Sequence, residues 1–397
     1  MNTKTKKIIS LALLGATTSL MAMYGEHAYL YKDPRIMGMG GANVAVGGYS
    51  TSVFSNPAGL ATIKKDHGFV VDLLGIGAST SEKTSTFIDD INTASDSGDD
   101  AEVVAVLQEY AGDYFHIGVD NYSAISKNSD AFAWSVGILA AADINYVTHA
   151  NGSSNGGLLE TSSRVYGGVV LGFAKPYHTK IGRLDVGLGL KYIQQTSYEG
   201  ALGVSELTNG DDIGQQLQDK YEETSSGMGL DIGVKYYPFQ DSSWNPAIGL
   251  SVLNIGPMDM DDNYGGQPMT VNIGASISPD VDYVDKLVIA VDYVDLFEAN
   301  KVRLYDYNDE GNVVKYTDYS ESDFTKRLRL GVNVGLIDST YFSTAISGGL
   351  YQGAYTAGID LELTLLKLNF ATYQEQVGTG SVDIPDRRYM AKISIGW

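Results

Sequence analysis

Residues 184–193, LDVGLGLKYI, alternate between apolar side chains and residues that are either charged or glycine. A period of two places successive side chains on opposite faces of a β-strand. One face of this segment is therefore apolar, whereas the other carries Asp185 and Lys191 with two glycines. A soluble sandwich also alternates, but its outer face is usually rich in Thr, Lys and Glu. Glycine with sparse charge on the second face favours a barrel wall, with lipid on one side and a crowded polar interior on the other.

The same alternation recurs along the chain. It is clear at residues 228–236 and 324–336, and fourteen such segments can be counted after residue 68. Most are close to the ~9–11 residues that a tilted strand needs to cross a bilayer. We therefore predict an all-β fold, a transmembrane antiparallel β-barrel of about 14 strands. The predicted strands are Phe69–Ile76, Tyr114–Ile125, Ala131–Ala140, Val165–Ala174, Leu184–Gln194, Met228–Tyr237, Ala247–Ile255, Met269–Ser278, Leu287–Val294, Phe324–Leu336, Phe342–Leu350, Ala354–Leu363, Leu368–Gln374 and Tyr389–Trp397.

The connections between these segments alternate in length. Those after even-numbered segments are brief, as at Ser126–Asp130 and Ile337–Thr340. Those after odd-numbered segments are mostly long and acidic, as at Thr196–Gly227 and Asp295–Asp323, and only the eleventh is short. Outer-membrane barrels arrange periplasmic turns and external loops in this way. We therefore expect the brief connections to face the periplasm and the long ones to face outside.

One long connection also carries a helical pattern. In DDAEVVAVLQEY, residues 99–110, acidic residues precede Val103, Val106, Leu107 and Tyr110, which share one helical face. The spacing predicts a short amphipathic helix that packs within the first loop.

The N-terminus has the features of an export signal. Lys4, Lys6 and Lys7 precede an apolar run at residues 8–14, and small residues continue to Ala22. We predict a signal peptide at residues 1–22. No later segment offers the roughly 18 apolar residues of a membrane helix, and the absence of cysteine excludes disulfides and a lipid-modified cysteine.

The charge and the aromatic residues suit a cell envelope. The formal net charge of -21 repels nucleic acid, which is therefore not an expected partner. The chain has 27 Tyr against 11 Phe, and many Tyr lie near the ends of predicted strands. A Tyr ring can lie in lipid with its hydroxyl among headgroups. We predict the outer membrane of a Gram-negative cell as the location, with membrane lipid as a partner.

Strand parity also assigns a set of charges to the barrel interior. On the lipid face near the midplane, an Arg or Lys would cost about 2–4 kcal/mol. The predicted lumen-facing charged residues are Asp185, Lys191, Asp231, Lys235, Asp292, Arg327, Arg329 and Lys392.

Residues 38–63, GMGGANVAVGGYSTSVFSNPAGLATI, precede the first predicted strand and are rich in small side chains. Small residues let a backbone pack closely against a wall, and Asn56 before Pro57 favours an extended or turn conformation. The lumen of a wide barrel stays open unless a segment fills it. We therefore predict a plug, or hatch, at residues 23–66 and an outer-membrane barrel at residues 67–397. The residues assigned to the plug are Gly38, Gly40, Gly41, Asn56, Pro57, Ala58 and Gly59.

This stretch supports a family resemblance. The pattern GxGGAxVA from Gly38, followed by VFxNPAGLA from Val53, resembles the hatch of FadL-type long-chain fatty-acid transporters and the related PorV-type outer-membrane proteins. In that family the N-terminal segment plugs a fourteen-stranded barrel and contains an Asn-Pro-Ala motif, which here falls on residues 56–58. The resemblance implies a barrel with a plug inside it. The expected architecture extends over the whole mature chain, but the matching motifs lie only at residues 38–61 and in the last strand.

The C-terminus, RYMAKISIGW, alternates up to a final aromatic residue. It resembles the signal by which Gram-negative barrels are recognised for insertion, which implies the barrel-assembly machinery as a partner. The residues assigned to this signal are Tyr389, Ile393, Ile395 and Trp397.

Two functions remain open from the sequence. The first is a plug-gated outer-membrane channel for hydrophobic or amphipathic small molecules, either fatty-acid-like or aromatic. The alternative is a barrel that transports nothing and serves as a structural or docking part of a secretion, surface-assembly or conjugal-transfer system. A continuous apolar corridor from the loops to the plug would favour transport, whereas a packed charged lumen would favour the alternative.

No pattern indicates catalysis, so we expect neither an enzyme nor a cofactor. The five histidines, His27, His67, His116, His149 and His178, have no metal-binding spacing. The acidic runs at residues 96–100 and 259–266 lack the spacing of a calcium loop, and solvated loops are the favoured interpretation.

Overall fold

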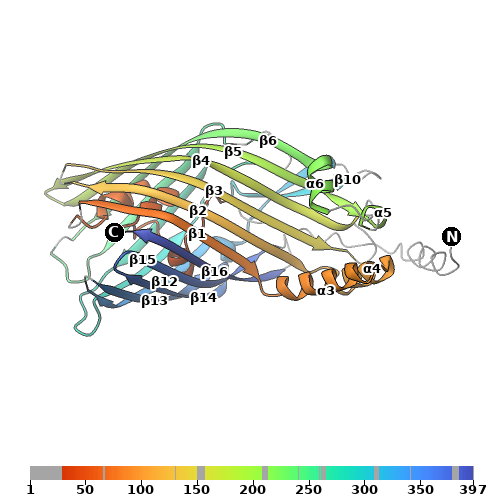
Figure 1. Cartoon of the computed structure of the whole chain (residues 1–397). Helices are drawn as coiled ribbons and strands as arrows, with labels where there is room; N and C mark the ends of the chain where they lie inside the picture. Colours follow the sequence, from red (N-terminus) through yellow and green to blue (C-terminus); the bar gives the residue numbers. More distant parts are fainter. Residues whose placement is uncertain are drawn as a thin grey trace.

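The chain forms a closed β-barrel with a short segment inside it (Figure 1). The computed structural model describes residues 29–65, 68–129, 131–149, 157–207, 213–239, 241–258, 260, 265–307, 313–339, 341–377 and 384–396. The predicted signal peptide at residues 1–22 and Trp397 lie outside the described residues. Fourteen antiparallel strands make up the wall, which confirms the predicted fold class.

Each predicted segment overlaps one strand of the wall. Neighbours follow chain order, β9 pairs with β12, and β16 closes the barrel on β1. The wall strands are β1 (Phe69–Ser81), β2 (Tyr114–Asn128), β3 (Ala133–Thr148), β4 (Gly157–Thr179), β5 (Gly182–Gly203), β6 (Glu222–Tyr237), β7 (Ala247–Ile255), β8 (Thr270–Ile277), β9 (Lys286–Tyr293), β12 (Leu328–Asp338), β13 (Phe342–Tyr351), β14 (Ala354–Leu363), β15 (Leu366–Gln376) and β16 (Pro385–Gly396).

The short and long connections lie at opposite ends of the barrel. Helices α3 to α6 gather at one end in Figure 1, which we call the loop end, and the brief connections lie at the turn end. The connection between β13 and β14 is the short exception, as predicted. The loop end also carries a separate hairpin, β10 (Lys301–Tyr307) with β11 (Val313–Ser320). Its other elements are α3 (Thr84–Asp96), α4 (Asp100–Glu109), α5 (Val204–Leu207), α6 (Ile213–Tyr221) and α7 (Phe324–Arg327).

The predicted helix in the first loop is present as α4. Val103 and Leu107 are buried, and Val106 and Tyr110 pack beside them. A second helix, α3, was not predicted; its Phe87 stacks on Phe115 of β2 with ring centroids 4.1 Å apart. The two helices therefore pack with residues of β2 and β4 into a small apolar core at the loop end.

One predicted strand begins too early in the sequence. Residues 324–327 form helix α7 instead of the start of β12, because the Asp323 side chain accepts the backbone N–H of Thr325 and caps a helical turn. Strands β4 and β5 were predicted too short, since they extend to 23 and 22 residues. Their pairing continues beyond the alternating core at both ends, to the tight turn at residues 180–181 and to the pair of Leu159 with Leu202 at the loop end.

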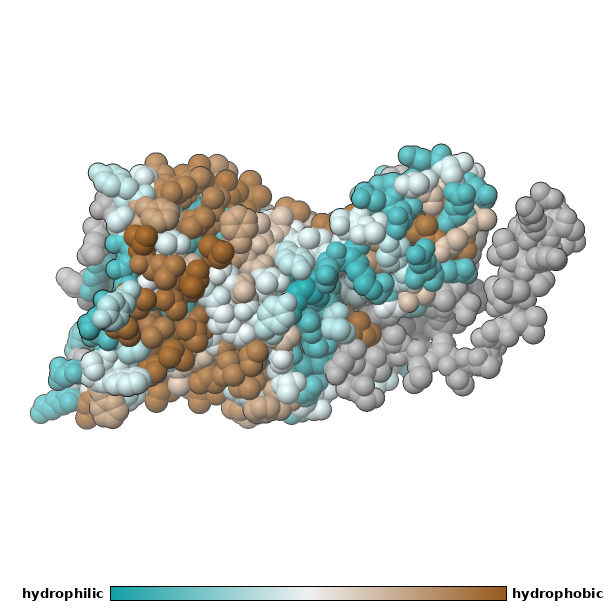
Figure 2. Space-filling view, turned by 90° about the horizontal axis from the view of Figure 1, so that it is seen from below, coloured by the Kyte–Doolittle hydropathy of each residue, from teal (hydrophilic) through white to brown (hydrophobic). Residues whose placement is uncertain are grey.

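The two faces of the wall differ as the alternation predicts. On β5, Leu188, Leu190 and Tyr192 are between 41% and 49% exposed, whereas Asp185 and Lys191 are at most 2% exposed. Figure 2 shows apolar side chains gathered in a band across the barrel, with hydrophilic side chains toward both ends. This arrangement is that of a transmembrane β-barrel with an apolar belt toward lipid. Among the described residues, no helix is long and apolar enough to cross a membrane.

Candidate functional site

Residues 29–63, which we call the N-terminal segment, lie inside the barrel (Figure 1). The segment contains α2 (Pro34–Gly38) and two short 3-10 helices, η1 (Ser50–Phe54) and η2 (Pro57–Thr62). Asp33 caps α2 and Asn56 caps η2, each with proline at the next position. Proline suits the first helical position because it has no N–H to satisfy there. The segment is thus shaped by caps and turns, and it joins no strand ladder.

Asn56 ties the segment both to itself and to the wall. Its Oδ1 accepts the N–H of Ala58 at 3.0 Å, and its Nδ2 donates to the carbonyl of Val44 at 2.8 Å and to that of Val234 on β6 at 3.1 Å. The side chain is 1% exposed, and a Cβ on Gly233 would lie 2.0 Å from its Oδ1. The wall glycine makes room for the amide.

Gly40 has a backbone conformation that other residues rarely adopt. Its φ is +66°, and an added Cβ would lie 2.1 Å from the carbonyl oxygen of Leu330 on β12. The neighbouring Gly38 and Gly41 also face the wall, since the Gly38 carbonyl accepts the hydroxyl of Thr356 at 2.8 Å. Pro57, Ala58 and Gly59 lie in η2 and are buried. All seven residues assigned to the plug therefore lie within the N-terminal segment.

Several charges on the wall bind the backbone of this segment. Asp292 on β9 accepts the N–H groups of Asn43 and Val44 at 2.5 and 2.7 Å. Lys235 on β6 donates to the carbonyl of Val46, and Lys392 on β16 donates to the Tyr31 hydroxyl at 2.6 Å. Charged groups make stronger hydrogen bonds than neutral ones, so these contacts fix the segment firmly.

Other predicted charges pair with one another. Asp185 accepts Arg183 at 2.7 Å, and Lys191 lies 3.0 Å from Asp231. Both carboxylates are 0% exposed, so each depends on its cation for stability.

Arg329 and Arg327 have different environments. Arg329 on β12 stacks over the Tyr351 ring at 4.0 Å and donates to two backbone carbonyls, and no carboxylate of the described residues lies within ion-pair distance of it. Arg327 was predicted on a strand, but it ends helix α7 and pairs with Glu298 at 3.0 Å. The helix cap at Asp323 explains the difference.

Sequence reasoning missed a second set of lumen charges. Lys32 pairs with Glu375 at 2.5 Å, and Arg35 pairs with Asp33 at 2.9 Å. Burial alone would raise the pKa of the Asp33 carboxyl, but the adjacent Arg35 guanidinium and a hydrogen bond from Thr51 hold it below its usual value. Strand parity, extended to every strand, could have found the wall members of this set, which also includes Asp72 with Lys367, Asp143 with Arg164, and Asp386 with Arg388.

An apolar cluster extends along part of the lumen. A single cluster of buried side chains begins at Met258 and Met260 beyond β7, continues along the inner faces of β2 to β5, and ends at Leu60 and Ile63 near the turn end. Its wall members include Tyr122, Leu139, Tyr166, Val170 and Ile193. The inner faces of β2 to β5 therefore carry this apolar cluster beside buried charges such as Asp143, Arg164 and Lys191, and the N-terminal segment packs against the cluster.

A cavity of about 190 Å³ adjoins the N-terminal segment. Its lining combines the rings of Tyr29, Tyr31, Phe54 and Tyr351 with the cations Lys32 and Arg329 and the carboxylates Asp33 and Asp295. Aromatic surface with a few placed polar groups is typical of small-molecule sites.

The structure joins Ser79, His116 and Asn145 in one chain of hydrogen bonds. The Ser79 hydroxyl lies 2.8 Å from Nε2 of His116, and Nδ1 of His116 lies 2.7 Å from the Asn145 amide oxygen. A nucleophile, a base and an orienting group can lie in this order in hydrolases. The inner cavity at Ser79 holds only about 20 Å³, which is room for one water, so we assign the chain a structural role. Among the described residues, no group of three His, Asp or Glu side chains could hold a metal ion.

The C-terminal residues lie on the lipid side of the wall. Tyr389, Ile393 and Ile395 of β16 are between 40% and 48% exposed, and β16 pairs with both β1 and β15. Their alternation places a row of apolar side chains in the belt, while recognition by an assembly machinery stays a prediction.

The architecture defines a class, the closed transmembrane β-barrels of fourteen antiparallel strands. Similar solved structures include a TodX deltaS2S3 mutant monoaromatic hydrocarbon channel, with a TM-score of 0.53 and 10% identity over 92% of this chain and 98% of that one. The Ralstonia pickettii toluene transporter TbuX has a TM-score of 0.50 and 13% identity over 93% and 98%. A Pseudomonas aeruginosa FadL homologue has a TM-score of 0.50 and 9% identity over 94% and 98%.

The sequence profile of the family described as "F plasmid transfer operon, TraF, protein" matches residues 53–348, and the chain belongs to that family. The expected resemblance to FadL-type proteins thus holds for the fold, and the family model that matches carries the transfer-operon description. No curated protein matches this chain.

Proposed function

We propose that the protein is an outer-membrane channel for small hydrophobic or amphipathic molecules, closed at rest by its N-terminal segment acting as a plug. The observation that carries this proposal is the apolar cluster that extends along β2 to β5 from the loop end to the turn end. A hydrophobic molecule could follow this surface once the plug has moved. The division into a plug at residues 23–66 and a barrel at residues 67–397 belongs to the same proposal.

Contacts on all sides support a plug. Four wall residues donate to carbonyls of the segment at 2.7–3.0 Å: Asn128 of β2 to two of them, and Arg164 of β4, Ser251 of β7 and Thr356 of β14 to one each. These strands are distributed around the whole barrel. A segment with hydrogen bonds to strands on all sides of the barrel blocks the lumen where it lies. Transport therefore requires the segment to rearrange.

The cavity beside the plug favours an amphipathic ligand. Its aromatic rings can contact an apolar body. Arg329, which has no carboxylate of the described residues within ion-pair distance, can attract an anionic end. We therefore expect a small aromatic carboxylate to bind more tightly than its uncharged methyl analogue. Replacing Arg329 with Gln should remove this preference and leave binding of the uncharged analogue unchanged in a calorimetric titration.

The second candidate function is a docking barrel for conjugal transfer. Two observations favour it: the family description, and the many buried ion pairs that pack the lumen. Such a barrel would keep its segment in place permanently.

Permeability distinguishes the two functions. Deleting residues 38–63 should raise the permeability of reconstituted liposomes to small solutes, and deleting the β10–β11 hairpin is the matched control. A folded barrel with unchanged permeability after the first deletion would refute the plug. Uptake of labelled aromatic and fatty acids by cells with and without the protein then tests transport itself, and equal uptake would favour the docking barrel.

A further inference from the structure

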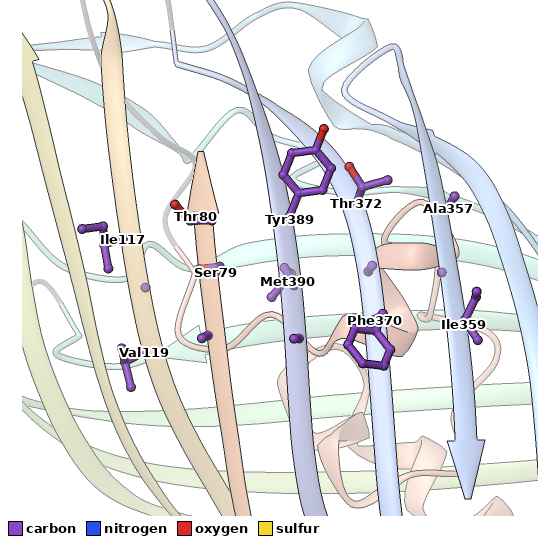
Figure 3. Close-up of a pocket in the computed structure, with 15 residues that line it drawn as sticks. Ser79, Thr80, Ile117, Val119, Ala357, Ile359, Phe370, Thr372, Tyr389 and Met390 are labelled. Carbon is purple, nitrogen blue, oxygen red and sulfur yellow. The ribbon is translucent and has the colours of Figure 1, made fainter. Parts of the chain in front are cut away.

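A groove crosses the outer face of the wall over β14, β15, β16, β1 and β2 (Figure 3). Its volume is about 680 Å³, within the range of about 300–1,000 Å³ that is usual for small-molecule sites. In Figure 3 the side chains of Phe370 and Tyr389 extend from the outer side of their strands, away from the helices inside. The groove therefore faces lipid, and the plug and the lumen cavity lie on the other side of the wall.

The register of the strands explains why the groove is hollow. Val119, Ala78, Ala391, Phe370 and Ile359 form one row across five adjacent strands, and all lie on the outer face. The second and third positions of this row are alanines, while Val119 and Phe370 on either side of them are 52% and 46% exposed. Three strand spacings, about 14 Å, separate these flanking residues. The two alanines thus form the floor of a gap that larger side chains border.

The row toward the turn end closes the gap. It contains Ile76 and Ile393, which are paired across β1 and β16 and fill the surface with bulky side chains. The groove is therefore a local feature of the belt and has a defined lower edge.

The polarity of the groove changes toward the loop end. The next row contains Thr80, Tyr389 and Thr372, which bring hydroxyl groups to its upper edge. Arg387 lies two residues further along β16, about 7 Å beyond Tyr389. Its guanidinium stacks over the Tyr355 ring at 3.9 Å, and no carboxylate of the described residues lies within ion-pair distance of it.

We propose that this groove is a binding site for an anionic lipid of the leaflet on the loop side. One acyl chain lies over Ala78 and Ala391, the ester region meets the hydroxyls of Thr80 and Tyr389, and the phosphate is next to Arg387. Along the groove, the apolar floor, the hydroxyl groups and the cation follow one another in the same order as the acyl chain, the ester region and the phosphate of such a lipid. Arginine suits the phosphate because its N–H groups can bind two oxygens at once.

Lipid is favoured over a protein partner by the surroundings of the groove. Apolar side chains around the groove, such as Ile76, Val119 and Ile359, are exposed on the outer face of the wall, where acyl chains surround a membrane barrel. Its cation lies only at the loop-side edge, which suits an amphiphile with one fixed orientation. A second copy of the chain is the other possible occupant, and the experiment below separates the two.

The test uses substitutions that fill the groove on the outer face and leave the lumen residues unchanged. Protein reconstituted in nanodiscs of phosphatidylcholine with a minor fraction of phosphatidylglycerol is extracted into detergent, and the retained lipid is measured by native mass spectrometry. We expect wild-type protein to retain phosphatidylglycerol. Ala391→Phe should reduce retention about tenfold because it occupies the place of several methylenes. Arg387→Gln should reduce the preference for the anionic lipid about fivefold and keep the acyl contact.

Two control variants make the same kinds of substitution at other positions on the outer face of the wall. Ala275→Phe adds the same ring on β8, between Ile248 and Val291, and Lys175→Gln removes a cation near a tyrosine at the turn end. Both should retain lipid as the wild type does. Heat-dependent gel mobility reports folding, and Ala78→Val, which adds less bulk, replaces Ala391→Phe if that variant does not fold.

Undiminished lipid retention in a folded groove variant would overturn the proposal. A dimer that the same substitution dissociates would also overturn it and identify a second copy as the occupant. Because the groove and the lumen are on opposite faces of the wall, this outcome is independent of whether the protein is a channel.

Discussion

The carboxylate of Asp292 accepts the backbone N–H of Val44 at 2.7 Å, which joins β9 to the N-terminal segment across 248 residues of sequence. The same oxygen also accepts the neighbouring N–H, so one side chain satisfies two buried donors. Replacing Asp292 with Ala leaves both donors unpaired, at a cost of about 1–3 kcal/mol each. We expect faster hydrogen exchange at residues 43–46 and a higher permeability of the barrel to small solutes. Unchanged exchange would show that other contacts suffice to hold the segment.

Asn56 provides a second, weaker attachment. Changing Asn56 and Pro57 to Ala removes the cap of η2 and the bond to the Val234 carbonyl, and cap loss alone costs about 1 kcal/mol. Permeability should rise, but by less than after deletion of residues 38–63. A rise as large as that of the deletion would mean that this one turn holds the whole plug. Thr93→Ala on exposed α3 is a control, since its hydroxyl bonds only within its own helix.

The buried pair of Lys191 and Asp231 should behave as a unit. Lys191→Met leaves a fully buried carboxylate without its cation, and we expect a loss of about 3–5 kcal/mol of stability. Adding Asp231→Leu should restore much of it, because two apolar side chains replace the pair. Urea unfolding in lipid measures both steps. If the double variant is no more stable than the single one, the pair contributes through its other bonds, such as the one from Lys191 to Asn254.

The absence of cysteine makes the orientation easy to test. Single cysteines at Ser129 and Ser339 lie in short turns, and one at Ser97 lies between α3 and α4. We expect an impermeant thiol reagent to label position 97 in intact cells and positions 129 and 339 only after the outer membrane is opened. The reverse labelling pattern would show that the barrel has the opposite orientation in the membrane.

The sequence predicts the wall well because its signal is local. Alternation with a period of two assigns each side chain of a strand to a face, and no knowledge of the neighbouring strands is needed. This is why the number of strands and the exposure of Leu188 and Tyr192 agree with the prediction. The prediction fails at residues 324–327, where a polar cap outweighs an alternating pattern.

The interior was harder to predict because its contacts join distant parts of the chain. Parity places Arg329 and Asp292 on the inside, but it cannot show that one stacks on Tyr351 while the other binds the Val44 backbone. Those partners depend on strand register and on the path of a segment that has no repeating pattern. The two faces of each strand were therefore determined by sequence alone. The closure of β1 on β16 places Ala78 beside Ala391, and only this tertiary pairing creates the outer groove and gives each lumen charge its partner.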